Sequence, residues 1–113
     1  MTLSVQFLSK AIVGIPGTTV SQATTDTSAA FSAGAIEAGN MYLFNSDKVT
    51  HLEFGSSGSG PTAVPATSLR LPPNQFLTVS TDEDVDLSII RGADETANGT
   101  LWCTNMLETA SKL

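Results

Sequence analysis

The stretch EFGSSGSGPTAVPATSLRLPPNQFLTVS, residues Glu53–Ser80, decides the fold class of this chain. Its first half, from Gly55 to Ala66, is rich in glycine, serine and proline and cannot hold a strand ladder, so we expect an exposed loop there. The runs TSLRL and QFLTVS in its second half alternate apolar and polar residues, which is typical of short β-strands. Pro72 and Pro73 separate the two runs, and because proline lacks an amide donor they predict a sharp corner.

Further strand patterns lie on both sides of this stretch. The runs MYLFNS and KVTHLEF, between Met41 and Phe54, are joined by turn residues and predict a hairpin. After the corner, VDLSIIR and TLWCTNML alternate and are separated by a polar loop with the turn signal Asn98-Gly99. Six candidate strands at short spacing predict an all-β chain folded as an antiparallel β-sandwich or barrel. We expect the core domain of this sandwich to span residues 39–113.

The N-terminal third follows a different pattern. The run LSVQFL has period two, with Leu3, Val5 and Phe7 on one side, and AIVGI is a short apolar run. The segment after it is rich in threonine, serine and alanine and can bury little area. We therefore expect one or two strands and an extended N-terminal arm over residues 1–38. Residues 27–39 predict either one or two helical turns or a strand with a bulge.

The composition bounds the partners and the compartment. Charged residues make up 14% of the chain, below the usual level of a globular protein, and serine and threonine wet the surface instead. A net charge of −6 and five scattered cations argue against a nucleic-acid partner and against binding to an anionic membrane. No basic segment precedes the apolar N-terminal residues and Lys10 interrupts them, so neither a signal peptide nor a transmembrane span is indicated, and we expect synthesis in the cytoplasm.

Few side chains could carry catalysis or hold a metal. Cys103 lies in an apolar run, where a buried and inert thiol is expected, and nothing local supports its pairing with His51. One histidine and one cysteine do not form a zinc site. The acidic run Asp82–Asp86 lacks EF-hand spacing, so we expect a solvated turn, with an ion site completed by another chain as the alternative. The sequence therefore predicts no catalytic residue, no metal site, no cofactor and no enzymatic activity.

The aromatic side chains bear on a possible sugar-binding function. A sugar-binding surface uses exposed aromatic rings. In this chain the rings lie inside strand patterns, where burial in the core accounts for them; they are Phe7, Phe44, Phe54, Phe76 and Trp102. We therefore expect these rings to fill the core and not to form a binding platform.

From Met41 to Leu107 the chain resembles a family of small virion proteins. The runs YLFNSDKVTHLEFG, SLRLPPNQFLTVS, VDLSIIRG and GTLWCTNM are similar to those of capsid decoration (cement) proteins of tailed bacteriophages and related head-associated proteins. The resemblance lies in strands and corners, includes no catalytic motif, and has no counterpart for the N-terminal third. It implies a jelly-roll-like β-sandwich that assembles as a homotrimer on the capsid exterior, binds the major capsid protein between capsomers, and stabilises the assembled head.

Two segments are candidates for contact with the capsid or with neighbouring subunits, the N-terminal arm and the loop from Gly55 to Ala66. The candidate contact residues are Leu3, Val5, Phe7, Ile12, Ile15, Ser57, Ser59 and Pro61. The loop has an alternative interpretation as a flexible crossover from one sheet to the other. The alternative function is a phage fibre-associated or host-recognition module in which the loop and Trp102 or Tyr42 contact a saccharide. A small hydrolase that uses His51 with an acidic residue is the third and weakest class.

Overall fold

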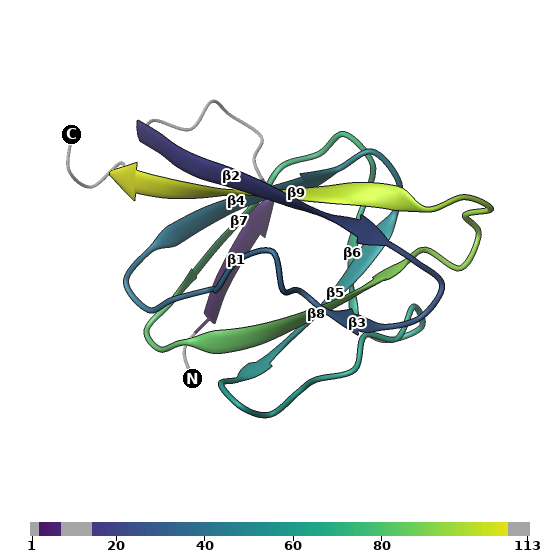
Figure 1. Cartoon of the computed structure of the whole chain (residues 1–113), viewed down its shortest axis with the longest axis horizontal. Helices are drawn as coiled ribbons and strands as arrows, with labels where there is room; N and C mark the ends of the chain where they lie inside the picture. The colour runs from purple at the N-terminus through teal and green to yellow at the C-terminus, as the bar shows by residue number, and fades with distance from the viewer. Residues whose placement is uncertain (1–2, 8–14, 109–113) are drawn as a thin grey trace.

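The computed structural model describes residues 3–7 and 15–108, and these form two antiparallel β-sheets (Figure 1). The five-stranded sheet has the order β1-β7-β4-β9-β2, with β1 Leu3–Phe7, β7 Leu77–Thr81, β4 Met41–Ser46, β9 Gly99–Glu108 and β2 Ile15–Thr24. The four-stranded sheet has the order β3-β8-β5-β6, with β3 Ala29–Ala30, β8 Val85–Arg91, β5 Thr50–Ser56 and β6 Leu69–Leu71. The described residues contain no helix. The predicted all-β antiparallel fold is therefore confirmed, as are the six strands predicted after residue 40.

The strand pairs are nested along the chain. β5 pairs with β6, β4 with β7, β3 with β8 and β2 with β9, and every pair is antiparallel. Two further pairs, β4 with β9 and β5 with β8, complete the two sheets. From β2 to β9, each strand therefore lies in the other sheet from the strand before it. The exception is β6, which lies beside β5 in the same sheet.

The predicted hairpin between residues 41 and 54 is wrong. β4 and β5 follow each other in the chain but belong to different sheets, so their connection is a corner. Distant segments hold this corner: the Ser46 carbonyl accepts the amide of Asn74 at 2.9 Å, and the Val49 carbonyl accepts the amide of Gly92 at 2.8 Å. A Cβ at Gly92 would lie 2.7 Å from a methyl carbon of Val49, so the close approach requires glycine. The turn residues predicted a change of direction but did not identify the strand that pairs with each side.

The predicted Pro-Pro corner is confirmed. β6 ends at Leu71 in the four-stranded sheet, and β7 begins at Leu77 in the five-stranded sheet. Asn74, between them, has a φ of 62°, a left-handed conformation that asparagine adopts more readily than most residues. The chain therefore changes sheets where two successive residues lack amide donors.

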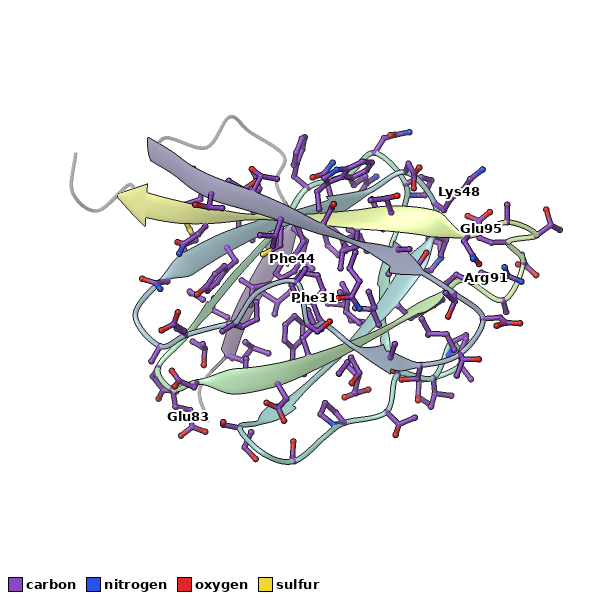
Figure 2. All side chains as sticks on the ribbon, viewed as in Figure 1. Phe31, Phe44, Lys48, Glu83, Arg91 and Glu95 are labelled. Atoms are coloured by element: carbon purple, nitrogen blue, oxygen red, sulfur yellow. The ribbon has the colours of Figure 1, made fainter. Side chains whose placement is uncertain are left out.

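The core lies between the two sheets, and Figure 2 shows Phe31 and Phe44 near its centre. Phe44 is fully buried and packs edge-on against Phe31, at 6.1 Å between ring centroids, and against Phe54, at 6.4 Å. The other large, fully buried apolar side chains come from both sheets and are Leu52, Leu71, Leu77, Val79, Ile89 and Leu101. These buried side chains explain the alternation of apolar and polar residues from which the strands were predicted.

In the N-terminal third, β1 pairs with β7 and β2 pairs with β9, each at an edge of the five-stranded sheet. The helical alternative for residues 27–39 is wrong. The segment holds the two-residue strand β3 and an isolated bridge between Ile36 and Val85, so the extended backbone of the predicted strand is confirmed and its bulge is not. Phe31 donates its amide to Leu87 at 2.7 Å, and Ile36 accepts the amide of Val85 at 3.1 Å, so the chain follows β8 on both sides of a break. Phe31 and Ile36 are buried and fix this segment on the core.

Thr24 provides a buried hydrogen bond that joins two parts of the chain distant in sequence. It is fully buried at the end of β2, and its hydroxyl accepts the amide of Gly99 at 3.0 Å. Replacing Thr24 by valine keeps the shape but leaves that amide unpaired, so we expect the free energy of unfolding to fall by about 1–3 kcal/mol in urea titrations. Thr19→Val is the matched control because the Thr19 hydroxyl is exposed and, within residues 3–7 and 15–108, bonds the Thr104 hydroxyl alone, at 2.8 Å. Equal losses in the two variants would contradict this prediction.

Candidate functional site

The loop between β5 and β6, residues 57–68, covers the outer side of the four-stranded sheet. Because β5 and β6 are neighbours in one sheet, its interpretation as a crossover between sheets is wrong. The carboxylate of Asp86 on β8 accepts the amides of Gly58 and Gly60 at 3.0 and 3.1 Å. Ala63 is 2% exposed and donates its amide to the Ser28 hydroxyl at 2.9 Å. The loop is therefore anchored at several points.

The covering loop explains burial on the outward side of the four-stranded sheet. Core-facing residues of β8, such as Leu87 and Ile89, alternate with Asp86, Ser88 and Ile90, yet Ser88 and Ile90 are also buried. His51 on β5 likewise faces away from the core and is buried. The four-stranded sheet is thus covered on both faces over this region.

The acidic turn supplies structural acceptors. Asp84 accepts the amide of Ala38 at 2.9 Å, and Asp86 holds the covering loop. Among the residues that the structure describes, no three histidine, cysteine, aspartate or glutamate side chains are grouped so as to hold a metal ion. The proposed ion site completed by another chain stays a prediction.

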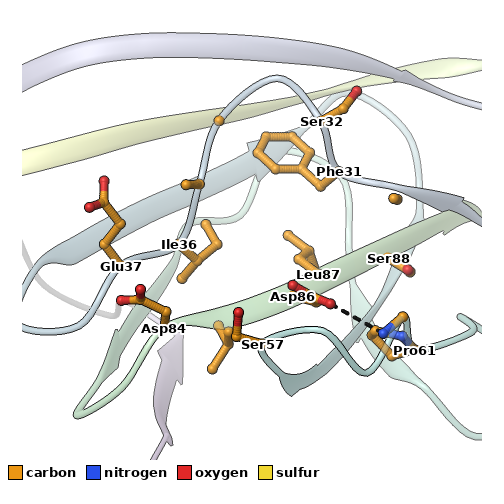
Figure 3. Close-up of a pocket in the computed structure, with 15 residues that line it drawn as sticks. Phe31, Ser32, Ile36, Glu37, Ser57, Pro61, Asp84, Asp86, Leu87 and Ser88 are labelled. Carbon is orange, nitrogen blue, oxygen red and sulfur yellow. Dashed lines mark hydrogen bonds between the residues drawn. The ribbon is translucent and has the colours of Figure 1, made fainter.

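A groove of about 490 Å³ opens beside this turn and is the stronger candidate for a binding site (Figure 3). The segment that runs along β8 forms one wall and contributes Phe31 and Glu37. The turn before β8 contributes Asp84, β8 contributes Asp86 and Ser88, and the covering loop contributes Ser57 and Pro61 on the opposite side. We call this hollow the acidic groove, because its charged lining residues are all carboxylates.

A second groove, of about 600 Å³, lies beside His51 and has a mixed lining. Val64 and other small apolar side chains form much of it, with Arg70, Asp94 and Glu95 as the charged groups. His51 Nδ1 lies 3.3 Å from the Ser68 carbonyl, and Glu95 accepts the amide of Val49 at 2.7 Å. Both contacts bind the side chains to backbone atoms, so this arrangement fixes loops, and the Ser68 hydroxyl donates to Glu53 at 2.8 Å.

Cys103 and His51 are not brought together. Cys103 belongs to the core cluster on β9 of the five-stranded sheet, whereas His51 faces away from the core on β5 of the other sheet. Burial raises the pKa of the Cys103 thiol to about 12. The expected buried thiol is confirmed, and its raised pKa disfavours the thiolate that nucleophilic chemistry needs.

The outer face of the five-stranded sheet carries no charge at the positions whose side chains the structure describes. Residues paired across β4 and β9 share a face, which places Met41, Leu43, Trp102 and Met106 on the side away from the core. Serine, threonine and alanine side chains flank them on β2 and β7, and Asn45 lies beside Trp102 on β4. In contrast, the labelled charged side chains Lys48, Glu83, Arg91 and Glu95 in Figure 2 lie on loops or at strand ends.

Three of the five rings expected in the core are placed otherwise. Phe44 is buried and Phe54 packs against the core, as predicted. Phe7 is 40% and Phe76 is 46% exposed, and Trp102 is half-buried on the outer face of the five-stranded sheet. Phe7 is the last residue of edge strand β1, and Phe76 lies just before β7 begins. The opposite sheet therefore does not cover either ring completely.

The predicted contact residues have different environments. Leu3 and Val5 pack against the core from β1, which accounts for their apolar side chains without a partner. Ser57 and Ser59 are exposed and Pro61 is half-buried in the covering loop. Ile12 lies outside the described residues, as does the side chain of Ile15. A contact role for any of the eight stays a prediction.

No family model, no curated protein and no solved structure matches the chain. In the described residues there is no helix of the length and apolarity needed to cross a membrane.

Proposed function

We propose that this protein is a structural virion protein that binds the outer surface of a phage capsid and stabilises the assembled head, without enzymatic turnover. The observation that carries the proposal is the outer face of the five-stranded sheet, which carries no charge at its described side chains in a chain of net charge −6. Desolvating charged groups is costly, and interface centres are depleted of them. The exposed and half-buried hydroxyl and apolar side chains of this face, among them Ser21, Leu43 and Trp102, can therefore be covered by a partner at low cost, whereas Met106 is already buried.

The strand order supports a jelly roll. The eight strands β2 to β9 form two four-stranded sets with nested antiparallel pairs, and β1 adds to one edge. Two-sheet jelly rolls are used in capsid and lectin domains, so the topology is compatible with both candidate functions. On this view β1 and β2 are the predicted N-terminal strands.

The proposed mechanism is thermodynamic linkage. A protein that binds the assembled shell and not its dissociated subunits stabilises the shell by mass action. We propose the major capsid protein as the partner, a homotrimer as the bound form, and the capsid exterior as the location. Cyclic symmetry is a common way for identical chains to cover such faces.

The test adds the purified chain to heads of the phage that encodes it, and measures co-sedimentation and the melting temperature of the heads. We expect Leu43→Glu to weaken binding by about tenfold or more, because it places an unpaired charge on the uncharged face. Ala97→Glu adds the same charge in an exposed loop and should bind like the unchanged chain. Ser21→Glu, at an exposed position on the same face, replaces Leu43→Glu if that variant does not fold.

Two results would count against the proposal. If the unchanged chain neither sediments with heads nor raises their melting temperature, decoration is excluded. If Leu43→Glu and Ser21→Glu bind as well as Ala97→Glu, decoration survives but this face is not the one that attaches.

The second candidate function is saccharide recognition, and the position of Trp102 favours it. Its indole is half-buried on the outer face and lies across from Asn45 and Ser21, an aromatic ring beside an amide and a hydroxyl. Tyr42 is 3% exposed and cannot share this role. Glycan-array binding that is lost in Trp102→Ala, without binding to heads, would favour this function.

A further inference from the structure

Strand β2 is an edge of the five-stranded sheet (Figure 1). It is ten residues long, Ile15–Thr24, and among the described strands it pairs with β9 alone. None of its residues is charged, and its proline and its register shifts lie before Thr19. The other edge strands are shorter: β1 has five residues, β6 has three, one of which is Arg70, and β3 has two. Because proteins usually protect edges with charges, prolines or short strands, the second half of β2 is an exception that a partner strand would explain.

The hydrogen bonds of β9 indicate which backbone groups of β2 are directed outward. The amide of Asp47, just after β4, donates to the Thr100 carbonyl at 3.4 Å and continues the register between β4 and β9. In an antiparallel sheet, successive residues of a central strand bond alternately to the strands on its two sides. Thr100 and every second residue after it therefore bond β4, and Leu101 and Cys103 direct their backbone groups to β2.

The same alternation applies to β2. Val20 and Gln22 lie opposite Cys103 and Leu101, so their backbone groups bond β9. The residues on either side of them direct their amides and carbonyls away from β9, and we call these the open-edge residues: Thr19, Ser21 and Ala23. No described residue forms a backbone hydrogen bond with them on that side. The edge therefore presents a row of alternating donors and acceptors that another strand could pair.

The surroundings of this edge leave room for another strand. On the core side Gln22 is already engaged, because its side chain donates to the Ala30 carbonyl at 2.9 Å and accepts the Ser32 amide at 2.8 Å. The segment that it holds, residues 28–35, has only small side chains apart from the buried Phe31. On the other face, the side chains of the open-edge residues are small and exposed. A strand can therefore approach β2 without displacing a large side chain or a charge.

We propose that β2 pairs with β2 of a second copy of this chain, antiparallel and around a two-fold axis at Ser21. Residues with outward backbone groups then meet each other, with Ser21 opposite Ser21 of the second copy and Thr19 opposite Ala23. Around a two-fold axis a charged residue lies close to its own copy, and like charges opposite each other are destabilising. An edge without charge and with small side chains at the paired positions is suited to such self-pairing. The pairing is a property of the free chain, so it can hold or fail independently of capsid binding.

Sedimentation equilibrium of the full chain between about 10 μM and about 1 mM measures the association. We expect the mean mass to rise from 11.7 kDa towards twice that value. Hydrogen exchange of the same samples locates the contact. The amides of the open-edge residues should exchange about fivefold or more slowly at the higher concentration, because the second copy accepts their hydrogen bonds. The amides of Val20 and Gln22 already bond β9 and should exchange slowly at both concentrations.

Substitutions at the edge separate backbone pairing from side-chain contact. Ser21→Pro removes the outward amide at the axis and should weaken association by about tenfold or more. Proline is tolerated on an edge strand where the amide faces solvent, and circular dichroism checks that the variant is folded. Ser21→Ala is the matched control, because it keeps the amide and should associate like the unchanged chain. If Ser21→Pro does not fold, Ala23→Lys replaces it by adding a charge at the edge, with Ala97→Lys in an exposed loop as its control.

Three outcomes would overturn the proposal. A chain that keeps its monomer mass up to about 1 mM would leave the edge to a strand of another protein. Open-edge amides that exchange as slowly in dilute as in concentrated samples would show that the edge is covered within one chain. A dimer that survives Ser21→Pro and is lost in Leu43→Glu would assign the contact to the outer face of the sheet.

Discussion

Replacing Phe44 by alanine is expected to lower the free energy of unfolding by about 3–5 kcal/mol. The ring is fully buried on central strand β4 of the five-stranded sheet and packs edge-on against Phe31 and Phe54, which both come from the side of the four-stranded sheet. Truncation removes buried apolar area and leaves a cavity that strands in two hydrogen-bonded sheets cannot readily close. The two edge-to-face contacts account for about 0.5–1.5 kcal/mol of this total for each pair.

Phe76→Ala is the matched control for this prediction. It makes the same chemical change at a ring that is 46% exposed, before β7 begins. Urea unfolding of both variants, followed by tryptophan fluorescence and circular dichroism, gives the two free energies on one scale. A cost for Phe76→Ala as large as that for Phe44→Ala would mean that the core does not centre on Phe44.

Alternation in the sequence predicts which residues of a strand share a face, but not what lies above that face. The period-two patterns located β4 to β9 correctly because each of these strands has one side in the core. The hairpin at residues 41–54 was wrong because partner choice depends on distant groups, here Asn74 and Gly92, which hold the corner. No local turn signal contains that information.

The same limit explains the misplaced side chains. His51 and Ser88 point away from the core, as alternation predicts, and are buried nevertheless because the covering loop lies over them. Trp102 is a large apolar residue of the kind that usually fills a core, but it lies on the outward face. Successive residues of a strand face opposite sides, and its neighbour Cys103 is the one that enters the core.

The candidate site was predictable in one part. The acidic run indicated Asp84 and Asp86 as candidate site residues, and both line a groove. Glu37 and Ser57 come from segments distant in sequence, which the pairing along β8 and the anchoring of the covering loop bring beside the run. Ser88 had no sequence signal, because its burial depends on that loop.

Cys103 is expected to react with a thiol reagent such as DTNB at pH 8 about a thousandfold more slowly in the folded protein than in urea. The pKa rises from 9.0 to about 12 through burial, and this lowers the fraction of thiolate, which is the reacting species, in the folded state. Burial at 4% exposure also blocks the approach of the reagent. A folded protein that reacts as fast as the unfolded one would contradict both the burial and the raised pKa.

The raised pKa also predicts the sign of a pH effect on stability. The folded state holds the thiol proton more tightly than the unfolded state, so this group's contribution is fully present below pH 9.0 and is lost as the pH rises towards 12. The loss approaches about 1.4 kcal/mol per pH unit within that window. Cys103→Ala lacks the titrating group, and groups common to both proteins cancel in the difference between their urea stabilities. The unchanged chain should therefore lose stability relative to Cys103→Ala between pH 9 and pH 11, and a constant difference over that range would show that the thiol does not have a raised pKa in the folded state.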